Sequence, residues 1–107
     1  MAKYLFRSAY TAEGVQGLLD EGGSGRLKEC ERLITSLGGH LESFYFGFGG
    51  ADTYIIADLP DNATAAAFRL AVTASGAVGT ETVVLLTSDE IDHATRQKVG
   101  YRAPGAR

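Results

Sequence analysis

An apolar run that is interrupted by Arg7 opens the chain, and its length and aromatic content are typical of a β-strand. The pattern predicts a strand over residues 3–10, with Tyr4 and Phe6 on one face and Leu5 and Arg7 on the other. Both faces carry apolar area, so the strand is expected to be covered on both sides. A covered guanidinium needs an anionic, hydrogen-bonding or ligand partner, and Arg7 therefore points to a polar pocket. The alternative is an edge strand with the head of Arg7 in solvent.

Three further strands are expected along the chain. Residues 40–48 are rich in aromatic side chains, and the β-branched run 53–57 follows after Gly49-Gly50-Ala51, so these two runs should form a hairpin. The last predicted strand covers residues 80–86.

The segments between these strands have apolar residues at helical spacing. A short or frayed helix is expected to open at residues 11–13, with Gly22-Gly23-Ser24-Gly25 as a flexible connector to a second helix over residues 27–37. An alanine-rich helix over residues 63–75 ends at a glycine, and a capping box at residues 87–90 precedes a terminal helix over residues 91–99.

The order β-α-β-β-α-β is the ferredoxin-like pattern, so the expected class is α+β with an extra C-terminal helix. Residues 1–99 form the single expected domain, and residues 100–107 an irregular tail, either mobile or draped over a neighbouring subunit. Helices cover only one face of such a sheet, whereas these strands are apolar on both. We therefore expect two sheets to pack together in a homodimer, a dimeric α/β barrel.

Composition excludes several classes of function. Ten basic and thirteen acidic residues give a net charge of −3 without a cluster of Lys and Arg, so nucleic acid is not an expected partner. The apolar stretches are too short for a signal peptide or a membrane span, and a soluble, cytoplasmic protein is expected. Cys30, the only cysteine, has no partner for a disulfide or a zinc site, and it falls on the apolar stripe of its helix as a small core residue.

Several short motifs together resemble the GYD domain family. The resemblance covers residues 3–92 and rests on Tyr4, residues 10–14 (YTAEG), 37–46 (LGGHLESFYF), 50–52 (GAD), 58–61 (DLPD), 80–82 (TET) and 86–87 (LT). The family's Gly-Tyr-Asp triplet stands here as Gly50-Ala51-Asp52, without its tyrosine. The resemblance implies a ferredoxin-like fold of the dimeric α/β-barrel type and no settled general function.

The candidate ligand-binding residues are polar groups that interrupt apolar strands: Arg7, Tyr45, Asp52, Tyr54 and Glu81. Strands one and four are neighbours in this fold, so an Arg7–Glu81 ion pair competes with a ligand-facing role for both residues. Tyr45 and Tyr54 offer aromatic walls with hydroxyl anchors, or serve as core or interface residues. Asp52 either binds a ligand or accepts hydrogen bonds from turn amides.

Acid–base chemistry would have to use His40, Glu42 or Glu81. His40 and Glu42 are expected on one strand face, although a histidine at a helix-to-strand junction is more often a solvated surface residue. His40, Glu42 and Asp52 lack the spacing of a compact ligand motif, and we expect neither a metal nor a cofactor. Arg26, after the glycine-rich run, offers an anion site as an alternative to the connector.

Three functions remain open. The first is a homo-oligomeric protein that binds a small metabolite between sheet and helices, with Arg7, Tyr45, Tyr54 and Glu81 lining the pocket. The second is a cofactor-independent oxygenase or isomerase acting on a small aromatic or polyketide-like compound, as the resemblance to the wider dimeric α/β-barrel group implies. The third is a structural assembly subunit without a ligand. Fold alone does not decide among them.

Overall fold

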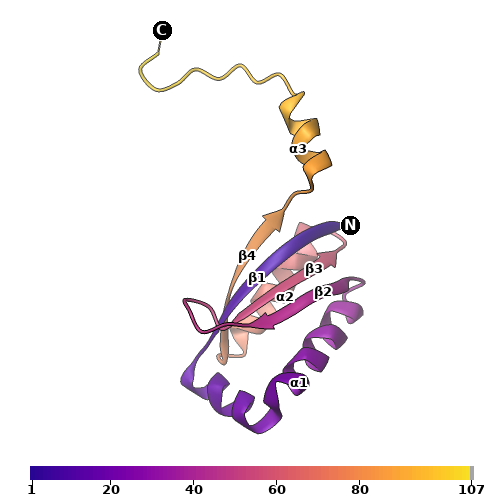
Figure 1. The fold of residues 1–107 in the computed structure, drawn as a ribbon, viewed down its shortest axis with the longest axis vertical. Helices are drawn as coiled ribbons and strands as arrows, with labels where there is room; N and C mark the ends of the chain where they lie inside the picture. The colour runs from indigo at the N-terminus through magenta and orange to yellow at the C-terminus, as the bar shows by residue number, and fades with distance from the viewer. Residues whose placement is uncertain (107) are drawn as a thin grey trace.

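A four-stranded antiparallel sheet in the order β2-β3-β1-β4 organises the chain, and the computed structural model describes residues 1–106 (Figure 1). Strand β1 (Ala2–Tyr10) lies between β3 (Thr53–Leu59) and β4 (Val78–Leu85). Strand β2 (His40–Phe46) pairs with β3 at the edge. The predicted hairpin and the adjacency of the first and last strands are both present.

The helices begin at side chains that cap them. Thr11 accepts a hydrogen bond from the Gly14 N–H at the start of α1 (Ala12–Ser36), and Asp61 accepts one from the Thr64 N–H at the start of α2 (Asn62–Ala74). Such caps satisfy amides that the first turn leaves unpaired. The α+β order, with its antiparallel sheet, agrees with a ferredoxin-like fold.

Helix α1 differs from the expected short helix followed by a flexible connector. It runs through the glycine-rich segment, and only Gly22 leaves helical geometry, with φ of 78° and ψ of 168°. A positive φ costs glycine nothing, because it has no Cβ. Two helical halves therefore meet at a kink at Gly22, as the glycine-rich run predicted, whereas the prediction that the whole run is a flexible connector was wrong.

The core lies between the two long helices and one face of the sheet. Tyr4 and Phe6 from β1 are fully buried there, and the Phe6 ring lies 4.6 Å from that of Phe68 on α2. Ile34 from α1 and Leu59 from β3 complete the centre of the core. The predicted alternation along β1 is confirmed, since the even-numbered residues face the helices.

The other side of the sheet, which we call the open face, has no helix over it within residues 1–106. Cross-strand register arranges it in rows. One row joins Ser43, Ile56, Leu5 and Val83, the next joins Tyr45, Tyr54, Arg7 and Glu81, and a third joins His40, Asp58, Lys3 and Leu85. An apolar row thus lies between two rows that carry charges.

Beyond β4 the chain leaves the body of the protein. Helix α3 (Ser88–Thr95) starts at the capping box formed by Thr87 and Glu90, several residues before the expected start at residue 91. None of its residues is buried, and Figure 1 shows α3 and the segment after it standing away from the sheet. No helix within the described residues has the length and apolar character needed to cross a membrane.

The close approach of α1 to the turn before β4 makes Gly14 sensitive to substitution. A Cβ at Gly14 would overlap the Ala77 carbonyl oxygen, whereas a Cβ at Gly17, one turn on, would meet no atom within 4 Å. We predict that Gly14→Ala lowers the free energy of unfolding by about 1–3 kcal/mol. Gly17→Ala should instead raise it by about 1 kcal/mol through helix propensity. Urea denaturation measures both, and equal effects would contradict the packing described.

Candidate functional site

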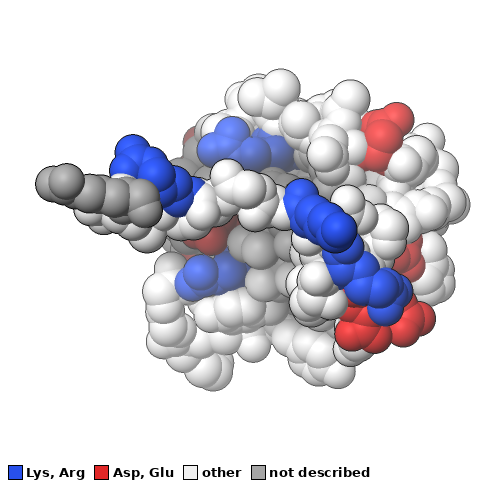
Figure 2. All heavy atoms as spheres, turned by 90° about the horizontal axis from the view of Figure 1, so that it is seen from above, with Lys and Arg blue, Asp and Glu red and all other residues white. Residues whose placement is uncertain are grey.

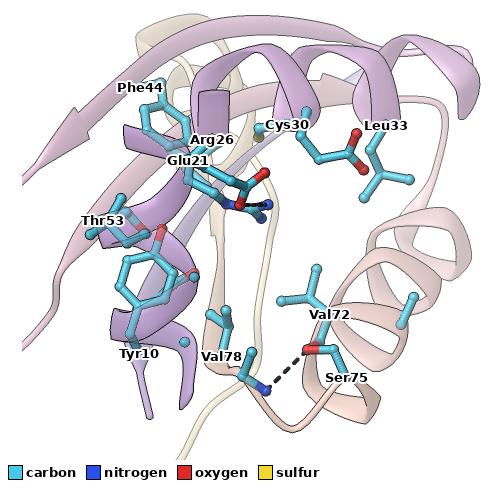
Figure 3. A pocket seen from close by; sticks show the side chains of 18 of the residues that line it. Tyr10, Glu21, Arg26, Cys30, Leu33, Phe44, Thr53, Val72, Ser75 and Val78 are labelled. Atoms are coloured by element: carbon cyan, nitrogen blue, oxygen red, sulfur yellow. Dashed lines mark hydrogen bonds and ion pairs between the residues drawn. The ribbon is translucent and has the colours of Figure 1, made fainter. Parts of the chain in front are cut away.

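A pocket of about 470 Å³ lies between α1, α2 and the helix-covered face of the sheet (Figure 3). Its apolar walls include Leu33, Phe44, Phe68 and Val72. Its polar lining includes Ser8, Tyr10, Glu21, Arg26 and Thr53. A concave, largely apolar space with a few convergent polar groups is the usual form of a small-molecule site.

Backbone contacts at the end of β1 position Tyr10 in this pocket. The Tyr10 N–H donates to Oδ2 of Asp52 at 2.8 Å, and the Asp52 N–H donates to the Ser8 carbonyl at 2.7 Å. The next residue, Thr11, donates its N–H to the Ala77 carbonyl at 2.9 Å. The end of β1 is thereby held to both the β2–β3 hairpin and the turn before β4.

The kink in α1 brings a charged pair to the pocket. Nη1 of Arg26 lies 3.3 Å from Oε2 of Glu21, and the two residues flank Gly22 on either side (Figure 3). The side chain of Arg26 is 31% exposed, so its guanidinium reaches both solvent and the pocket. With five N–H donors, a guanidinium that pairs with one carboxylate still has donors for a ligand.

The Tyr10 hydroxyl remains a neutral donor at physiological pH. Burial raises the pKa of Tyr10, and the neighbouring Arg26 guanidinium only partly opposes the rise. Burial disfavours the charged form of Arg26, yet its pKa is raised because Tyr10 and Glu21 stabilise the cation. The pocket therefore offers a phenol and a permanent cation side by side.

Cys30 lines the same pocket as a neutral thiol. Burial raises its pKa from 9.0 to about 11, with Arg26 acting in the opposite direction. A thiol is a weak nucleophile until it loses its proton. Cys30 is thus part of the wall, in agreement with its interpretation as a core residue.

The sequence-predicted ligand residues lie elsewhere. Arg7, Tyr45, Tyr54 and Glu81 form one row of the open face, so their expected place between sheet and helices was wrong. Since every strand of this sheet carries apolar residues on both sides, alternation alone did not tell which side the helices cover. A ligand-binding role for these residues stays a prediction, now for the open face.

The Arg7–Glu81 ion pair is confirmed. Nη1 of Arg7 lies 3.6 Å from Oε1 of Glu81, and the guanidinium carbon lies 5.9 Å from the centre of the Tyr54 ring. Nε of Arg7 is buried without a hydrogen-bond partner among the described residues. A smaller hollow of about 260 Å³ adjoins the pair, with Gly50, Ala51 and Gly79 among its walls.

The candidate acid–base residues do not form a constellation. The β2–β3 register shifts between Leu41 and Ser43, at Glu42, and both His40 and Glu42 lie beside Lys3 on the open face, which agrees with the expectation that they share a face. Glu42 accepts a hydrogen bond from Nζ of Lys3 at 2.7 Å, and this bond raises the pKa of Lys3. Asp58 lies 3.0 Å from the same Nζ. These charges form a surface cluster at one end of the open face.

Asp52 takes the turn role, since its carboxylate accepts the Tyr10 amide described above. Within residues 1–106, no three His, Cys, Asp or Glu side chains are placed to hold a metal ion. Sequence reasoning missed Tyr10 altogether and gave Arg26 only as an alternative. The sequence carries no clear signal for this pair, because it does not reveal that Gly22 adopts the positive φ at which α1 changes direction before Arg26.

Comparison with known protein families identifies the domain. The sequence model described as GYD domain matches residues 4–95, which extends from β1 to the end of α3. Neither a curated protein nor a solved structure matches the chain.

The raised pKa of Cys30 predicts slow alkylation. At pH 8 a thiol of pKa 9.0 is about 10% ionised and one of pKa about 11 about 0.1% ionised, so iodoacetamide should modify Cys30 about 100-fold more slowly in the folded protein than in urea. The rate in the folded state should rise tenfold per pH unit up to about pH 10. Equal rates in the folded and unfolded states would contradict the burial of this thiol.

Proposed function

This chain belongs to the GYD domain family, and we propose that it is a homo-oligomeric protein that binds a small molecule in the pocket between α1, α2 and the sheet. The observation that carries the proposal is the pocket itself, whose volume of about 470 Å³ falls in the range of sites for small organic ligands. Its walls are mostly carbon, and its polar groups converge from both β1 and α1.

The lining suggests the chemistry of the ligand. Phe44 and Phe68 favour a flat or aromatic skeleton, because rings pack well against rings. Tyr10 and Arg26 are hydrogen-bond donors, and they suit an acceptor such as an enol, phenolate, carboxylate or sulfonate oxygen. The ligand class that fits best is a compact aromatic molecule with one oxygen-rich end.

Binding is favoured over catalysis by the placement of the reactive groups. His40, Glu42 and Glu81 belong to the open side or edge of the sheet, away from this pocket. Cys30, which does line it, is held as a neutral thiol. A sensor, carrier or chaperone of a metabolite needs only the donors and walls described. An oxygenase or isomerase would need a base that faces the ligand, and of the three glutamates that line the pocket, Glu21 and Glu29 are held in ion pairs with Arg26 and Arg32, which leaves Glu13 for that role.

A second copy of the chain is the proposed cover of the open face. The central row of Ile56, Leu5 and Val83 is apolar, and the rows on either side carry Arg7 and Lys3 with their acidic partners. An apolar centre with a polar rim is the usual anatomy of a protein interface. A two-fold axis through this face would place each apolar row against its own copy.

Two fluorescent probes of nearly equal shape test the pocket. N-phenyl-1-naphthylamine is neutral, and 1-anilinonaphthalene-8-sulfonate carries an anionic group. We predict that Arg26→Gln weakens the sulfonate about tenfold and leaves the neutral probe nearly unchanged, because the lost interaction is a charge-assisted hydrogen bond. Lys28→Gln, which removes an exposed charge from the same helix, is the matched control.

A larger side chain at Gly17, which lines the pocket, should block both probes. Gly17→Leu is expected to reduce the affinity for each probe at least tenfold without loss of stability, whereas Gln16→Leu, on the exposed side of α1, should not. Fluorescence titration measures these affinities. Unchanged binding of both probes to Gly17→Leu would exclude this pocket as the site.

The open-face interface is tested by one charge at its centre. Ile56→Glu should convert a micromolar dimer into a folded monomer, because it would bury two unpaired carboxylates in the interface. Val84→Glu, at an exposed position on the other side of the sheet, is the control and should remain dimeric. Sedimentation velocity with circular dichroism makes the measurement. A wild-type protein that is monomeric at micromolar concentrations would refute the interface.

A further inference from the structure

Basic side chains are spread over the protein rather than gathered into one surface. On the end of the molecule seen in Figure 2, Lys and Arg side chains lie in separate groups, with Asp or Glu side chains beside some of them. A small charged ligand would therefore be recognised by an individual residue and its neighbours rather than by a basic patch. Among the arginines, Arg7 has the surroundings that such recognition requires.

The guanidinium of Arg7 has unused hydrogen-bond donors. Its Nη1 is 3.6 Å from Oε1 of Glu81, too far for a hydrogen bond, and its Nε is buried without a partner among the described residues. The Tyr54 ring, 5.9 Å from the guanidinium carbon, stabilises the cation without using an N–H group. The other arginines within residues 1–85 each donate a hydrogen bond, Arg26 to Glu21, Arg32 to Glu29 and Arg69 to the Thr80 carbonyl.

The hollow of about 260 Å³ beside Arg7 lies where β1, β4 and the loop between β2 and β3 meet. Arg7 pairs with Glu81 and Ala9 pairs with Gly79, so these four residues share the open face. The loop contributes Gly50 and Ala51 to the walls. Because two of these wall residues are glycines without side chains, the space next to the guanidinium stays open.

The loop adds backbone donors to this hollow. Within residues 1–106, the N–H groups of Gly50 and Ala51 donate to no backbone carbonyl. The loop is nevertheless held in place, since the Asp52 N–H donates to the Ser8 carbonyl at 2.7 Å and Ala51 is only 5% exposed. Unpaired amides of a fixed turn beside a cation suit a carboxylate oxygen.

Glu81 supplies the opposite charge. Its side chain is 63% exposed on the edge strand β4, and it accepts no hydrogen bond within the described part of the chain. A simple anion at Arg7 would be repelled by this carboxylate. A molecule with a positive group next to its negative group would instead be attracted by both residues.

We infer that this hollow binds a small zwitterion of the α-amino acid class, with its carboxylate on Arg7 and the loop amides and its ammonium group on Glu81. The two charged groups of an α-amino acid are attached to the same carbon, so one small molecule pairs with both residues. A space of about 260 Å³ suits an amino acid with a short side chain. The walls come from one chain, and Arg7 and Glu81 face away from the pocket between the helices and the sheet. The inference is therefore independent of the proposed function.

Glycine and acetate are matched probes, because glycine is acetate with one hydrogen replaced by an ammonium group. Each is titrated into the ¹⁵N-labelled full chain at pH 7 and constant ionic strength, and the amide signals of Gly50, Ala51 and Gly79 are followed by NMR. We expect saturable shifts at these signals, with glycine bound about fivefold more tightly than acetate through the additional exposed ion pair. No saturable shift with glycine, or acetate bound as tightly as glycine, overturns the inference.

Two charge variants separate the roles of the pair. Arg7→Gln should weaken both probes about tenfold or more, because it removes a charge-assisted hydrogen bond to the carboxylate. Glu81→Gln should weaken glycine about fivefold and strengthen acetate, since the partner of the ammonium group and the repulsion of the anion are lost together. Arg32→Gln, which removes an exposed guanidinium from α1, is the control and should change neither affinity. Unchanged glycine binding in Arg7→Gln, or an unchanged preference for glycine in Glu81→Gln, overturns the inference.

A steric variant tests the hollow itself. A Cβ at Gly79 would meet only the Ala9 carbonyl oxygen, at 3.9 Å, so Gly79→Val should fold normally and fill the space beside Arg7. It should abolish glycine binding, whereas Gly17→Leu, in the other pocket, should bind glycine like the wild type. Glycine binding that persists in Gly79→Val overturns the inference. The fluorescent probes of the proposed function are decided separately by the Gly17 and Arg26 variants.

Discussion

The alternation of side chains along β1 is the constraint on which the rest of the structure depends. Because β1 is paired on both sides, every second residue is fixed to one face of the sheet. Tyr4 and Phe6 go to the helices, where they anchor the core, and Tyr10 continues that face to the wall of the pocket. Arg7 goes to the open face, where it meets Glu81. A shift of one residue in register would move the core residues to the open face and Arg7 to the side of the helices. The hydrogen bonds that fix the register of β1 therefore determine the positions of the core, the pocket wall and the charged row together.

The pocket is enclosed by α1, α2 and the helix-covered face of the sheet. Gly14 allows α1 to start against the Ala77 carbonyl, and Gly22 bends the helix so that Arg26 returns over the end of β1. Glycines at these points lower the stability of the helix. The cap at Thr11 and the buried face around Ile34 compensate for this loss. The space left between the helices is lined by aromatic rings, by the Glu21–Arg26 ion pair and by the carboxylates of Glu13 and Glu29, and it offers both apolar walls and polar anchors to a small molecule.

Much of the fold could be predicted from the sequence, because its signals are local. Alternation placed Leu5 and Arg7 opposite Tyr4 and Phe6, and the Thr87–Glu90 box predicted a helix start. The β-α-β-β-α-β order made Arg7 and Glu81 neighbours on adjacent strands and so allowed their ion pair as one of two alternatives. The site could not be predicted in the same way. Tyr10 and Arg26 are separated by most of α1 and meet only because Gly22 adopts a positive φ, which composition does not reveal. The side of the sheet that the helices cover was also ambiguous, since both sides are apolar, and the bulge at Glu42 left no pattern in the sequence.

The central claim is that the pocket between α1, α2 and the sheet holds a small molecule. Native mass spectrometry of the protein purified from its own host, followed by denaturing release of anything retained, tests it most directly. The account predicts one compound per chain, aromatic and oxygen-bearing, that is retained by the wild type and lost from the Gly17→Leu variant purified in the same way. A compound retained equally by both proteins, or a wild type that is reproducibly empty under gentle conditions and binds neither probe, would contradict it.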